Sequence, residues 1–576
     1  MDYLSVLIKY MSMANILKIN LSDKSYKLAS IDKKIIKTYL GGRGLGAYLY
    51  SKSPKKAEDP DNSVFIVPGL LTGTMFPSSS RSFVVTSSPL TNYYTASSFG
   101  GMFGAFLKHS GISVLEMSGR SNTWHYLVVE DSKVAFKDAK DLMGKTVLET
   151  QEILQKKFKD RKVSIAAIGQ GGENLVKFSS LMFDKRAAGR TGTGWHFGFK
   201  KIKAIVVVGG NNLEISENPQ KVRKIIRELF SKKLENDKKK PDYATSAFTE
   251  WSNLVQTYPA SNYRNNFVSG KDIIGLSGDT LKKFGVKKEA CWSCPLACTR
   301  IVKDQKLQEV KGPEYETIWA LGANCDNFDM GVVIKCNHLC DSFSLDTIST
   351  GGVLAWYKEC IDVGLVRDKW SPDKMYKLIE ETALRKGVGK YLADGVVVAA
   401  KHFGFGSELV AHSKGLELPA WDPRSAIGMA VSYATSPTGG DHCKGWTVAE
   451  DTAEPKVRFS IKGKAQNVIK QQNRSALIDS LGTCMFAEFL YDLDIWSQII
   501  SAFFGWKKSL VELNKVGEKV FDTEYKINKK LGHKLSENTL PSKIIDYEIK
   551  VDGEKVVLTR KMFTDMMRDY VKLRGW

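Results

Sequence analysis

The chain has 576 residues, 43% of them hydrophobic and 10% aromatic, so it can bury large cores and is expected to form two or three domains. This composition excludes a disordered tail, and nine cysteines in this length do not indicate a disulfide-stapled secreted protein. A net charge of +21 favours an acidic partner, either nucleic acid, a membrane surface or a protein, with a lysine-rich solvated surface as the alternative. No apolar run approaches the roughly 18 residues of a membrane span, and the opening lacks signal-peptide features, so we expect a cytoplasmic protein.

Taken in chain order, the pattern predicts an α+β protein with a β-rich part followed by helical parts. Residues 1–13 are interpreted as a short extension, and residues 14–211 as a β-rich domain, because short apolar runs alternate with Gly, Pro, Ser and Asn. Its predicted strands lie within 63–69, 82–90, 124–136, 163–172 and 203–210, and one helix is predicted at 147–158.

Helical spacing of apolar residues predicts two further, mainly helical domains at 212–404 and 405–576. The helices expected in the first of these lie near 219–234, 332–340, 348–362 and 372–385. In the second, loops are predicted at 419–424 and 435–444.

The strongest single signal is Cys291-Trp-Ser-Cys294-Pro-Leu-Ala-Cys298. A turn can bring these three sulfurs to one centre, and three clustered thiolates with a distant fourth commonly hold a [4Fe–4S] cluster. A zinc site normally needs a second ligand pair, which is absent here, and buried structural thiols are the other alternative. The spacing leaves the fourth thiol open, with candidates Cys325, Cys336, Cys340, Cys360, Cys443 and Cys484.

Glycine-rich segments at 41–46, 99–101 and 186–194 could bring backbone N–H groups to a phosphate. The sequence GGRGLG at 41–46 is more typical of a tight β-turn. Two arginines among small residues make 186–194 the better candidate for an anion site. No strand–GxGxxG–helix unit and no GxxxxGK[ST] loop fits, so a nicotinamide cofactor is not favoured.

Two similar hexapeptides, 341–346 and 479–484, each begin with Asp-Ser. Their carboxylates could bind N–H groups of two similar heterocycles, although sequence alone favours two helix N-caps. Glu316 and His442 lie beside turns that contain Gly or Pro, where catalytic groups are common, but a lone Glu or His is usually structural.

Together these segments resemble the aldehyde:ferredoxin oxidoreductase family over essentially the whole length, from residue 14 to residue 576. The matching stretches, in order, are LGGRGLGAYL, PGLLTGT, SSRSFVVTSSPLT, FGGMFGAFLK, RAAGRTGTG, CWSCPLAC, GPEYETIWALGANC, LDTISTGG, LELPAWDPR, YATSPTGGDH, LIDSLGTC and YVKLRGW. So many ordered matches make chance convergence very improbable.

The resemblance implies two tungstopterins that chelate one tungsten (or molybdenum) between the β-rich base domain and the helical domains. It assigns the [4Fe–4S] cluster to Cys291, Cys294, Cys298 and Cys484, and a Mg²⁺ ion to the pterin phosphates beside Ser98. It places Arg81 between pterin and cluster. The other residues that it assigns to the cofactor are Gly100, Arg186, Ala187, Gly189, Arg190, Asp341, Leu345, Asp346, Lys444, Asp479 and Thr483.

The resemblance further implies oxidation of aldehydes to carboxylic acids, with electrons passed to ferredoxin or to a small iron–sulfur subunit. Glu316 and His442 would form the acid–base pair. His442 would polarise the aldehyde carbonyl and Glu316 would take the proton as water adds. Trp421 stands where relatives usually have a pocket-lining tyrosine. In some homodimeric members a glutamate and a histidine three residues later bind a bridging iron. Here Lys335 replaces that glutamate while His338 keeps the histidine, which argues against an iron-bridged homodimer.

Two other functions were weighed against aldehyde oxidation. A carboxylic-acid or aromatic-ring reductase subunit would use the same scaffold and cofactors, and Trp421 and Cys325 keep this possibility open. A basic, zinc-holding nucleic-acid binder is disfavoured, because no second ligand pair and no nucleic-acid motif accompany the charge.

Overall fold

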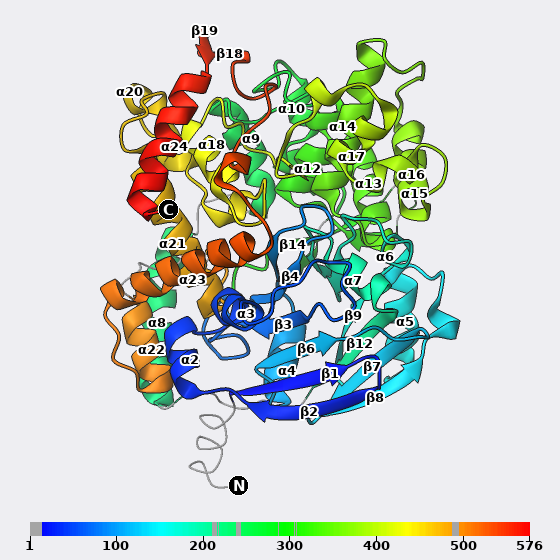
Figure 1. Cartoon of the computed structure of the whole chain (residues 1–576), viewed down its shortest axis with the longest axis vertical. Helices are drawn as coiled ribbons and strands as arrows, with labels where there is room; N and C mark the ends of the chain where they lie inside the picture. Colours follow the sequence, from blue (N-terminus) through cyan, green and yellow to red (C-terminus); the bar gives the residue numbers. More distant parts are fainter. Residues whose placement is uncertain are drawn as a thin grey trace.

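The computed structural model describes residues 14–209, 216, 218–237, 243–285, 287–304, 306, 308–486 and 495–576, with the backbone alone for 230–237. The predicted extension at 1–13 and the boundary at 211 lie outside these ranges. The strands of the N-terminal part lie at the bottom of Figure 1, and most helices of the later part lie above and to the left of them. The prediction of an α+β protein with its β-rich part first is confirmed.

Two six-stranded sheets form the N-terminal part. The first has the order β2-β1-β6-β3-β4-β5 and the second the order β11-β10-β9-β12-β7-β8. The strands of the first sheet are β1 (Asn15–Asn20), β2 (Ser25–Ser30), β3 (Val64–Pro68), β4 (Ser82–Ser87), β5 (Tyr94–Phe99) and β6 (Val114–Ser118). Those of the second are β7 (His125–Glu130), β8 (Lys133–Asp138), β9 (Val163–Ala167), β10 (Leu181–Phe183), β11 (Arg186–Ala188) and β12 (Ile202–Val208). The strands predicted from apolar runs are therefore all present.

Successive side chains on these strands point to opposite faces of the sheet and therefore enter different cores. In β3, Val64 and Ile66 pack in a cluster that both sheets share, whereas Phe65 and Val67 pack in another on the far side of the first sheet. That second cluster includes residues of helix α3 (Gly42–Tyr50) and Ile527. Helix α5 (Val147–Lys157) covers the outer face of the second sheet. Both sheets are consequently buried on two sides, which explains their continuous apolar runs.

The β-turn predicted at 41–46 is wrong, because the chain is helical from Gly42 onward. The glycines serve close packing. A Cβ at Gly44 would lie 2.7 Å from Ser480 Oγ, and one at Gly46 would lie 2.5 Å from Val85 Cγ2. Small residues allow the helix to approach its neighbours where a turn-forming role was expected.

Helices dominate the rest of the chain and pack in two clusters. The larger cluster draws on both predicted helical domains, so their division at 404 stays a prediction. The principal helices are α8 (Pro219–Asp237), α12 (Tyr315–Leu321), α13 (Met330–Phe343), α14 (Thr347–Asp362), α15 (Pro372–Leu384), α17 (Val396–Phe403), α18 (Ile427–Thr435), α21 (Lys464–Leu481), α22 (Ile495–Phe504), α23 (Leu510–Lys530) and α24 (Arg560–Arg574). A small sheet of β13 (Lys287–Glu289), β14 (Thr299–Lys303) and β15 (Glu309–Lys311), which was not predicted, interrupts them. Among the described residues, no helix has both the length and the apolar character needed to cross a bilayer.

A buried ion pair ties the C-terminal segment to helix α14. Lys543 Nζ lies 2.6 Å from Glu359 Oε2, and both side chains are only 4% exposed. Asn262 donates a further hydrogen bond to the same carboxylate at 2.6 Å. Removal of one partner of such a pair leaves a buried charge without compensation.

We therefore expect Glu359→Leu to lower the free energy of unfolding by about 3–5 kcal/mol. Thermal unfolding followed by circular dichroism measures the effect. The control is Lys561→Ala, which removes an ion pair with Asp565 whose lysine is 85% exposed, and which should cost below about 1 kcal/mol. Equal midpoints for the two variants would contradict the prediction.

Candidate active site

The three clustered cysteines lie on the turn between β13 and β14. The Cys294 N–H donates to the Cys291 carbonyl at 3.1 Å, which closes the first part of this turn. Ser293 and Ala297 both have positive φ, 50° and 42°, so the backbone reverses direction twice within the segment. All three cysteines are partly exposed and none forms a disulfide.

Backbone hydrogen bonds bring the fourth cysteine to this turn. The Ser78 N–H donates to the Ser293 carbonyl at 2.8 Å, and the Cys484 N–H donates to the Ser78 carbonyl at 3.1 Å. The Arg81 N–H in turn donates to the Gly482 carbonyl at 2.9 Å. One loop of the N-terminal part therefore contacts both cysteine-bearing segments.

Two partly buried guanidinium groups compensate the charge of the sulfurs. Arg81 Nη2 donates to Cys484 Sγ at 3.2 Å, and the negative charge of Cys484, with those of Cys291 and Cys298, raises the pKa of Arg81. Arg186 Nη2 lies 3.8 Å from Cys298 Sγ. Burial acts to lower the pKa of Arg186, but the neighbouring negative charges outweigh it and raise that pKa.

The donor set at this point fits an iron–sulfur cluster. Burial first, and then the charge of Glu314, raises the pKa of Cys298 to about 12, so a bound metal must displace its proton. Gly100 supplies space at the sulfurs, since a Cβ there would lie 2.8 Å from Cys291 Sγ. Ser78 Oγ lies 3.4 Å from Cys294 Sγ. Four thiols, two guanidinium groups and the space left by Gly100 suit an anionic group that cysteines hold.

A cavity of about 350 Å³ adjoins Arg81. Seven residues that the resemblance assigns to the cofactor or to catalysis line it: Arg81, Ser98, Glu316, His442, Lys444, Asp479 and Thr483. Aromatic side chains form much of the remaining wall, namely Phe248, Tyr315, Trp421, Trp446 and Phe486. Trp421 is in ring contact with three of these, at centroid distances of 4.9 Å to Tyr315, 5.4 Å to Trp446 and 6.0 Å to Phe248.

Glu316 and His442 meet on this cavity. Glu316 Oε1 lies 3.4 Å from His442 Nε2, while Glu316 Oε2 accepts the Ala420 N–H at 2.9 Å. The first turn of α12 supplies Glu316, and a short 3₁₀ turn, His442–Lys444, supplies the histidine. Burial acts to lower the pKa of His442, but the Cys443 sulfur, 3.3 Å from Nε2, and Glu316 outweigh it and raise the pKa to about 10. His442 is therefore protonated at neutral pH and can donate from both nitrogens.

Several lining residues carry buried polar atoms that have no hydrogen-bond partner within the described residues. These are Glu316 Oε1, His442 Nδ1, Thr483 Oγ1, Trp421 Nε1 and Trp446 Nε1. Buried polar atoms are rarely left unpaired unless a bound group completes them. Their concentration at one cavity suits a polar ligand that offers both donors and acceptors.

The first hexapeptide, 341–346, does not line this cavity. Asp346 caps helix α14 by accepting the Ile348 N–H at 3.0 Å, and it also accepts from Arg190 Nε at 3.2 Å. Asp341 lies in the last turn of α13, with Lys311 Nζ at 3.3 Å, and Leu345 is buried in the core. The N-cap interpretation is wrong for Asp341 and Asp479, the aspartates that open the two hexapeptides, because both lie within helices, and the N-cap in the first segment is Asp346.

The 186–194 segment faces protein groups. Arg190 donates to the carbonyls of Gly440 and Glu417, and Arg186 pairs with Glu314 at 3.3 Å. Ala187 lies in β11 and packs against the core on the outer face of the second sheet, and Gly189 has open space around its Cα. None of these residues, nor Gly100, lines the cavity described above.

Two family models match consecutive parts of the chain. "Aldehyde ferredoxin oxidoreductase, N-terminal domain" matches residues 16–209, and "Aldehyde ferredoxin oxidoreductase, domains 2 & 3" matches residues 221–576. The chain belongs to the aldehyde ferredoxin oxidoreductase family. It is therefore an oxidoreductase of a family that binds a tungsten bis-pterin and a [4Fe–4S] cluster.

Relatives agree with this membership, and one solved structure shares the fold. The tungsten-containing aldehyde ferredoxin oxidoreductases of Thermococcus kodakarensis and Pyrococcus furiosus are each 35% identical over 98% of this chain and 96% of their own. The WOR-like subunit of an aliphatic sulfonate oxidoreductase of Pyrococcus furiosus is 28% identical over 74% of each chain. The active-site complex BamBC of benzoyl coenzyme A reductase shares the fold, with a TM-score of 0.86 at 20% identity, over 98% of this chain and 95% of that one.

Sequence reasoning missed several residues of this oxidoreductase site. Cys443 was considered only as a cluster ligand, yet it lines the cavity beside His442. Glu314, Phe248 and Trp446 were not singled out. The adjacency of Cys443 to His442 could have indicated its place, but nothing local distinguishes Phe248 or Trp446 from core aromatics.

Gly100→Ala should impair retention of the iron–sulfur cluster, because the new methyl group would overlap Cys291 Sγ. Overpacking of this kind costs about 1–3 kcal/mol, which should reduce iron per chain to less than about half of the wild-type value. Iron analysis of anaerobically purified protein measures this. Glu359→Leu is the control, since it lowers stability at the buried ion pair with Lys543 and leaves the Cys291–Cys298 turn unchanged. Full iron content in Gly100→Ala would refute the argument.

Proposed function

We propose that this enzyme oxidises aldehydes to carboxylic acids at a bis-pterin tungsten (or molybdenum) centre beside the cavity. Electrons would leave through a [4Fe–4S] cluster to ferredoxin or a small iron–sulfur subunit. The observation that carries the proposal is the contact of Glu316 with His442 on the same cavity as Arg81, whose guanidinium reaches Cys484. Substrate, acid–base pair and electron outlet then lie in one continuous region.

The family resemblance assigns residues to each group, and the cavity and the cysteine segments support part of this assignment. Cys291, Cys294, Cys298 and Cys484 would bind the cluster, and Arg81 would lie between it and the pterin centre. Asp479, Thr483 and Lys444, which line the cavity, would contact pterin, and Ser98 would lie near a magnesium ion that neutralises the pterin phosphates. When bound, the tungsten bis-pterin would accept two electrons from the aldehyde, and the cluster would pass them on singly.

The acid–base pair has a separate task for each member. An N–H of the protonated His442 would donate to the aldehyde oxygen and stabilise the charge that develops there. Glu316 Oε1, which lacks a hydrogen bond among the described residues, would take the proton from the water that adds to the carbonyl carbon. The reaction balances as aldehyde plus water giving carboxylic acid, two electrons and two protons.

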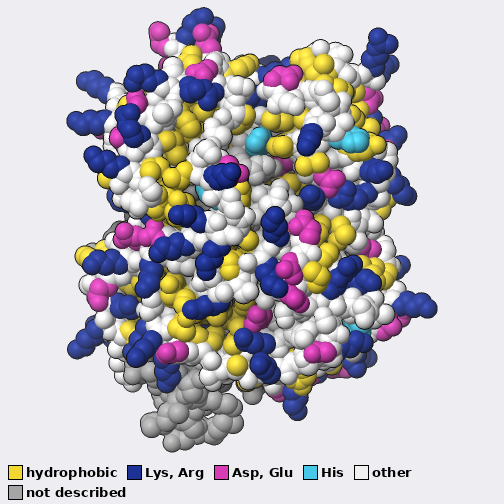
Figure 2. All heavy atoms as spheres, in the orientation of Figure 1, with side chains coloured by type: hydrophobic (Ala, Val, Ile, Leu, Met, Phe, Trp, Pro, Cys, Tyr) yellow, Lys and Arg dark blue, Asp and Glu magenta, His cyan; other side chains and the backbone are white. Residues whose placement is uncertain are grey.

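Charge and surface chemistry support an acidic electron carrier as partner. Lys and Arg side chains are spread over the face in Figure 2, with fewer acidic ones between them. The net charge of +21 would steer an acidic protein toward this surface. An iron-bridged homodimer is not proposed, because Lys335 lies over the Tyr376 ring, 3.7 Å from its centroid, where a carboxylate ligand would be needed.

A reductase acting on carboxylic acids or aromatic rings is the second candidate. The aromatic wall of Phe248, Tyr315, Trp421 and Trp446 would suit an aryl substrate in either reaction. Cys325 gives it little support, since this thiol is buried against the carbonyls of α12 and α14 and does not line the cavity. Aldehyde-dependent reduction of a viologen dye separates the two candidates.

Glu316→Gln and His442→Asn should each retain metal and pterin but lower kcat by about 10²-fold or more, because each removes a proton-transfer or charge-stabilising group. Aldehyde-dependent dye reduction measures kcat, and metal analysis verifies the cofactor. Glu450→Gln also alters a carboxylate on the cavity and should remain within about threefold of wild type. Wild-type kcat in Glu316→Gln or His442→Asn would remove that residue from the mechanism.

The association rate with an acidic ferredoxin should fall by about tenfold or more when ionic strength rises from about 0.01 M to 0.15 M, as the Debye length shortens from about 30 Å to 8 Å. Stopped-flow reduction of ferredoxin at several concentrations gives this rate. A cationic viologen provides the comparison and should show no such fall. A ferredoxin rate that is independent of salt would exclude the steering role of the basic surface.

A further inference from the structure

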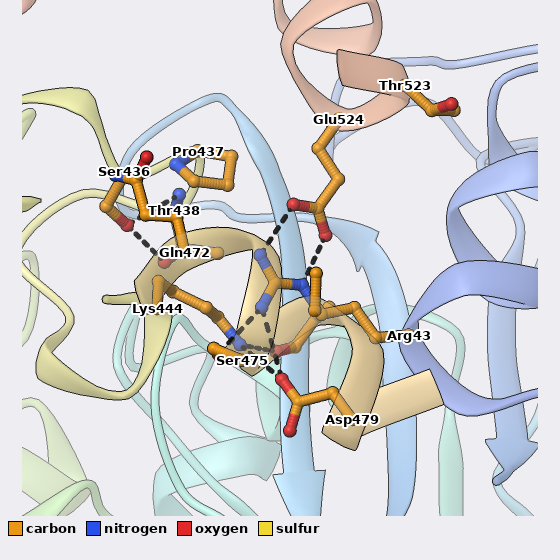
Figure 3. A network of polar contacts seen from close by, with 12 residues as sticks. Arg43, Ser436, Pro437, Thr438, Lys444, Gln472, Ser475, Asp479, Thr523 and Glu524 are labelled. Carbon is orange, nitrogen blue, oxygen red and sulfur yellow. Dashed lines mark hydrogen bonds and ion pairs between the residues drawn. The ribbon is translucent and has the colours of Figure 1, made fainter. Parts of the chain in front are cut away.

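The arginine of the GGRGLG segment forms the centre of a buried polar network. Arg43 is fully buried on α3, and its Nε and Nη2 donate to Glu524 Oε1 and Oε2, both at 2.8 Å. Its Nη1 donates to Ser475 Oγ and to Asp479 Oδ2, each at 3.2 Å. Figure 3 shows the guanidinium between Glu524 of α23 on one side and Asp479 of α21 on the other.

The glycines around Arg43 bring it into this position. The Gly41 N–H donates to the Ser480 carbonyl at 3.0 Å, and the Gly44 N–H donates to Ser480 Oγ at 3.1 Å. A Cβ at Gly42 would lie 2.3 Å from the Asp479 carbonyl oxygen. The glycines therefore let the backbone of α3 approach α21 closely, and from there the Arg43 side chain reaches the Asp479 carboxylate.

Asp479 receives two cations on one oxygen. Besides the Arg43 contact, Oδ2 lies 3.9 Å from Lys444 Nζ, which is itself fixed by a 2.9 Å hydrogen bond to the Ala96 carbonyl. In Figure 3 the dashed contacts of this carboxylate all run to one oxygen, and the other oxygen has none to the residues drawn. Asp479 lines the cavity, so a second acceptor is left for a group bound there.

The charges of the network alternate. Glu524, Arg43, Asp479 and Lys444 follow one another with opposite signs, and Lys444 also lies 3.9 Å from Asp441, so each charge has an opposite neighbour. Burial raises the pKa of Asp479, and the charges of Lys444 and Arg43 oppose that rise. Loss of Arg43 would leave two buried carboxylates with less compensation.

We propose that Arg43 is a positioning residue for the cofactor: through Asp479 it holds the free carboxylate oxygen where it accepts an N–H of the nitrogen heterocycle bound in the cavity. The inference rests on the proposed function, which puts pterin at Asp479. Arg43 does not itself line the cavity, so it acts only through this carboxylate.

The test compares pterin retention in the anaerobically purified holoenzymes of Arg43→Lys, Asp479→Asn, their double variant and Glu359→Leu. Lysine keeps the charge but cannot hold Glu524 and Asp479 with one planar fork. Pterin released during gel filtration is measured by the fluorescence of its oxidised form, with iron content and thermal midpoint recorded in parallel. Glu359→Leu loses stability through a buried ion pair outside this network, so it reports what destabilisation alone does.

Arg43→Lys and Asp479→Asn should each release pterin about tenfold faster than wild type, as expected for loss of a charge-assisted hydrogen bond. The double variant should be no faster than Asp479→Asn, because both changes act on one contact. Glu359→Leu should retain pterin despite a lower thermal midpoint. If Arg43→Lys does not fold, Glu524→Asp replaces it. This variant moves the carboxylate away from the Arg43 guanidinium by one methylene, and it should also release pterin faster than wild type.

Wild-type retention in Arg43→Lys, or a double variant whose effects multiply, would overturn the inference while leaving the proposed function in place. Retention in Asp479→Asn would overturn the assignment of pterin to Asp479 and the inference with it. A wild-type enzyme without pterin would overturn the proposed function itself.

Discussion

The backbone of residues 69–81 makes hydrogen bonds with both cysteine-bearing segments, and the geometry of the site depends on them. The Leu71 N–H donates to the Leu481 carbonyl at 2.7 Å, in addition to the bonds that join Ser78 to the Cys291–298 turn and to Cys484. Glycine is needed where the 69–81 segment meets the end of helix α21, because a Cβ at Gly69 would lie 2.0 Å from the Gly482 Cα. Buried backbone groups must all be paired, so a shift of this loop would break several bonds at once. Thiols almost two hundred residues apart in sequence are thereby held at one place regardless of side-chain freedom.

A second consequence of this junction is that cations are removed from water where three parts of the chain meet. Arg43 and Lys444 are buried, and Arg81 and Arg186 are partly buried. A charge is costly to bury alone, and each of the four has a carboxylate or a sulfur as its neighbour. Sulfurs and carboxylates therefore position the cations, and the cations in turn favour ionised sulfur. A polyanionic cofactor would add to this balance, which suits a site that is rich in positive charge before the cofactor binds.

Periodicity predicted the strands and helices because spacing of two or 3.6 residues depends only on which face is buried. The β-turn predicted from the glycines at 41–46 was wrong. These glycines allow close packing against a helix more than four hundred residues later in the sequence, a contact that no local pattern contains. The residues alone left six candidates for the fourth thiol, and resemblance selected Cys484. What separates Cys484 from Cys325 in the structure is backbone pairing with Ser78, which is likewise a long-range property. Glu316 and His442 were selected as catalytic candidates by resemblance, and their contact depends on packing between helix α12 and a distant loop.

The aromatic side chains that line the cavity affect which molecules bind there. The rings of Tyr315, Trp421 and Trp446, which meet in tilted and edge-to-face contacts, exclude water and lower the local dielectric, and this strengthens the attraction between His442 and Glu316. A neutral aldehyde loses little when it leaves water for such a space, whereas a carboxylate loses much of its hydration. The carboxylate of Glu316 also repels a second carboxylate that forms beside it. The aromatic wall and Glu316 thus favour a neutral substrate, whereas the protonated His442 and Lys444 on the same cavity attract an anion, so the case for aldehyde oxidation rests on the acid–base pair and not on the charge of the cavity.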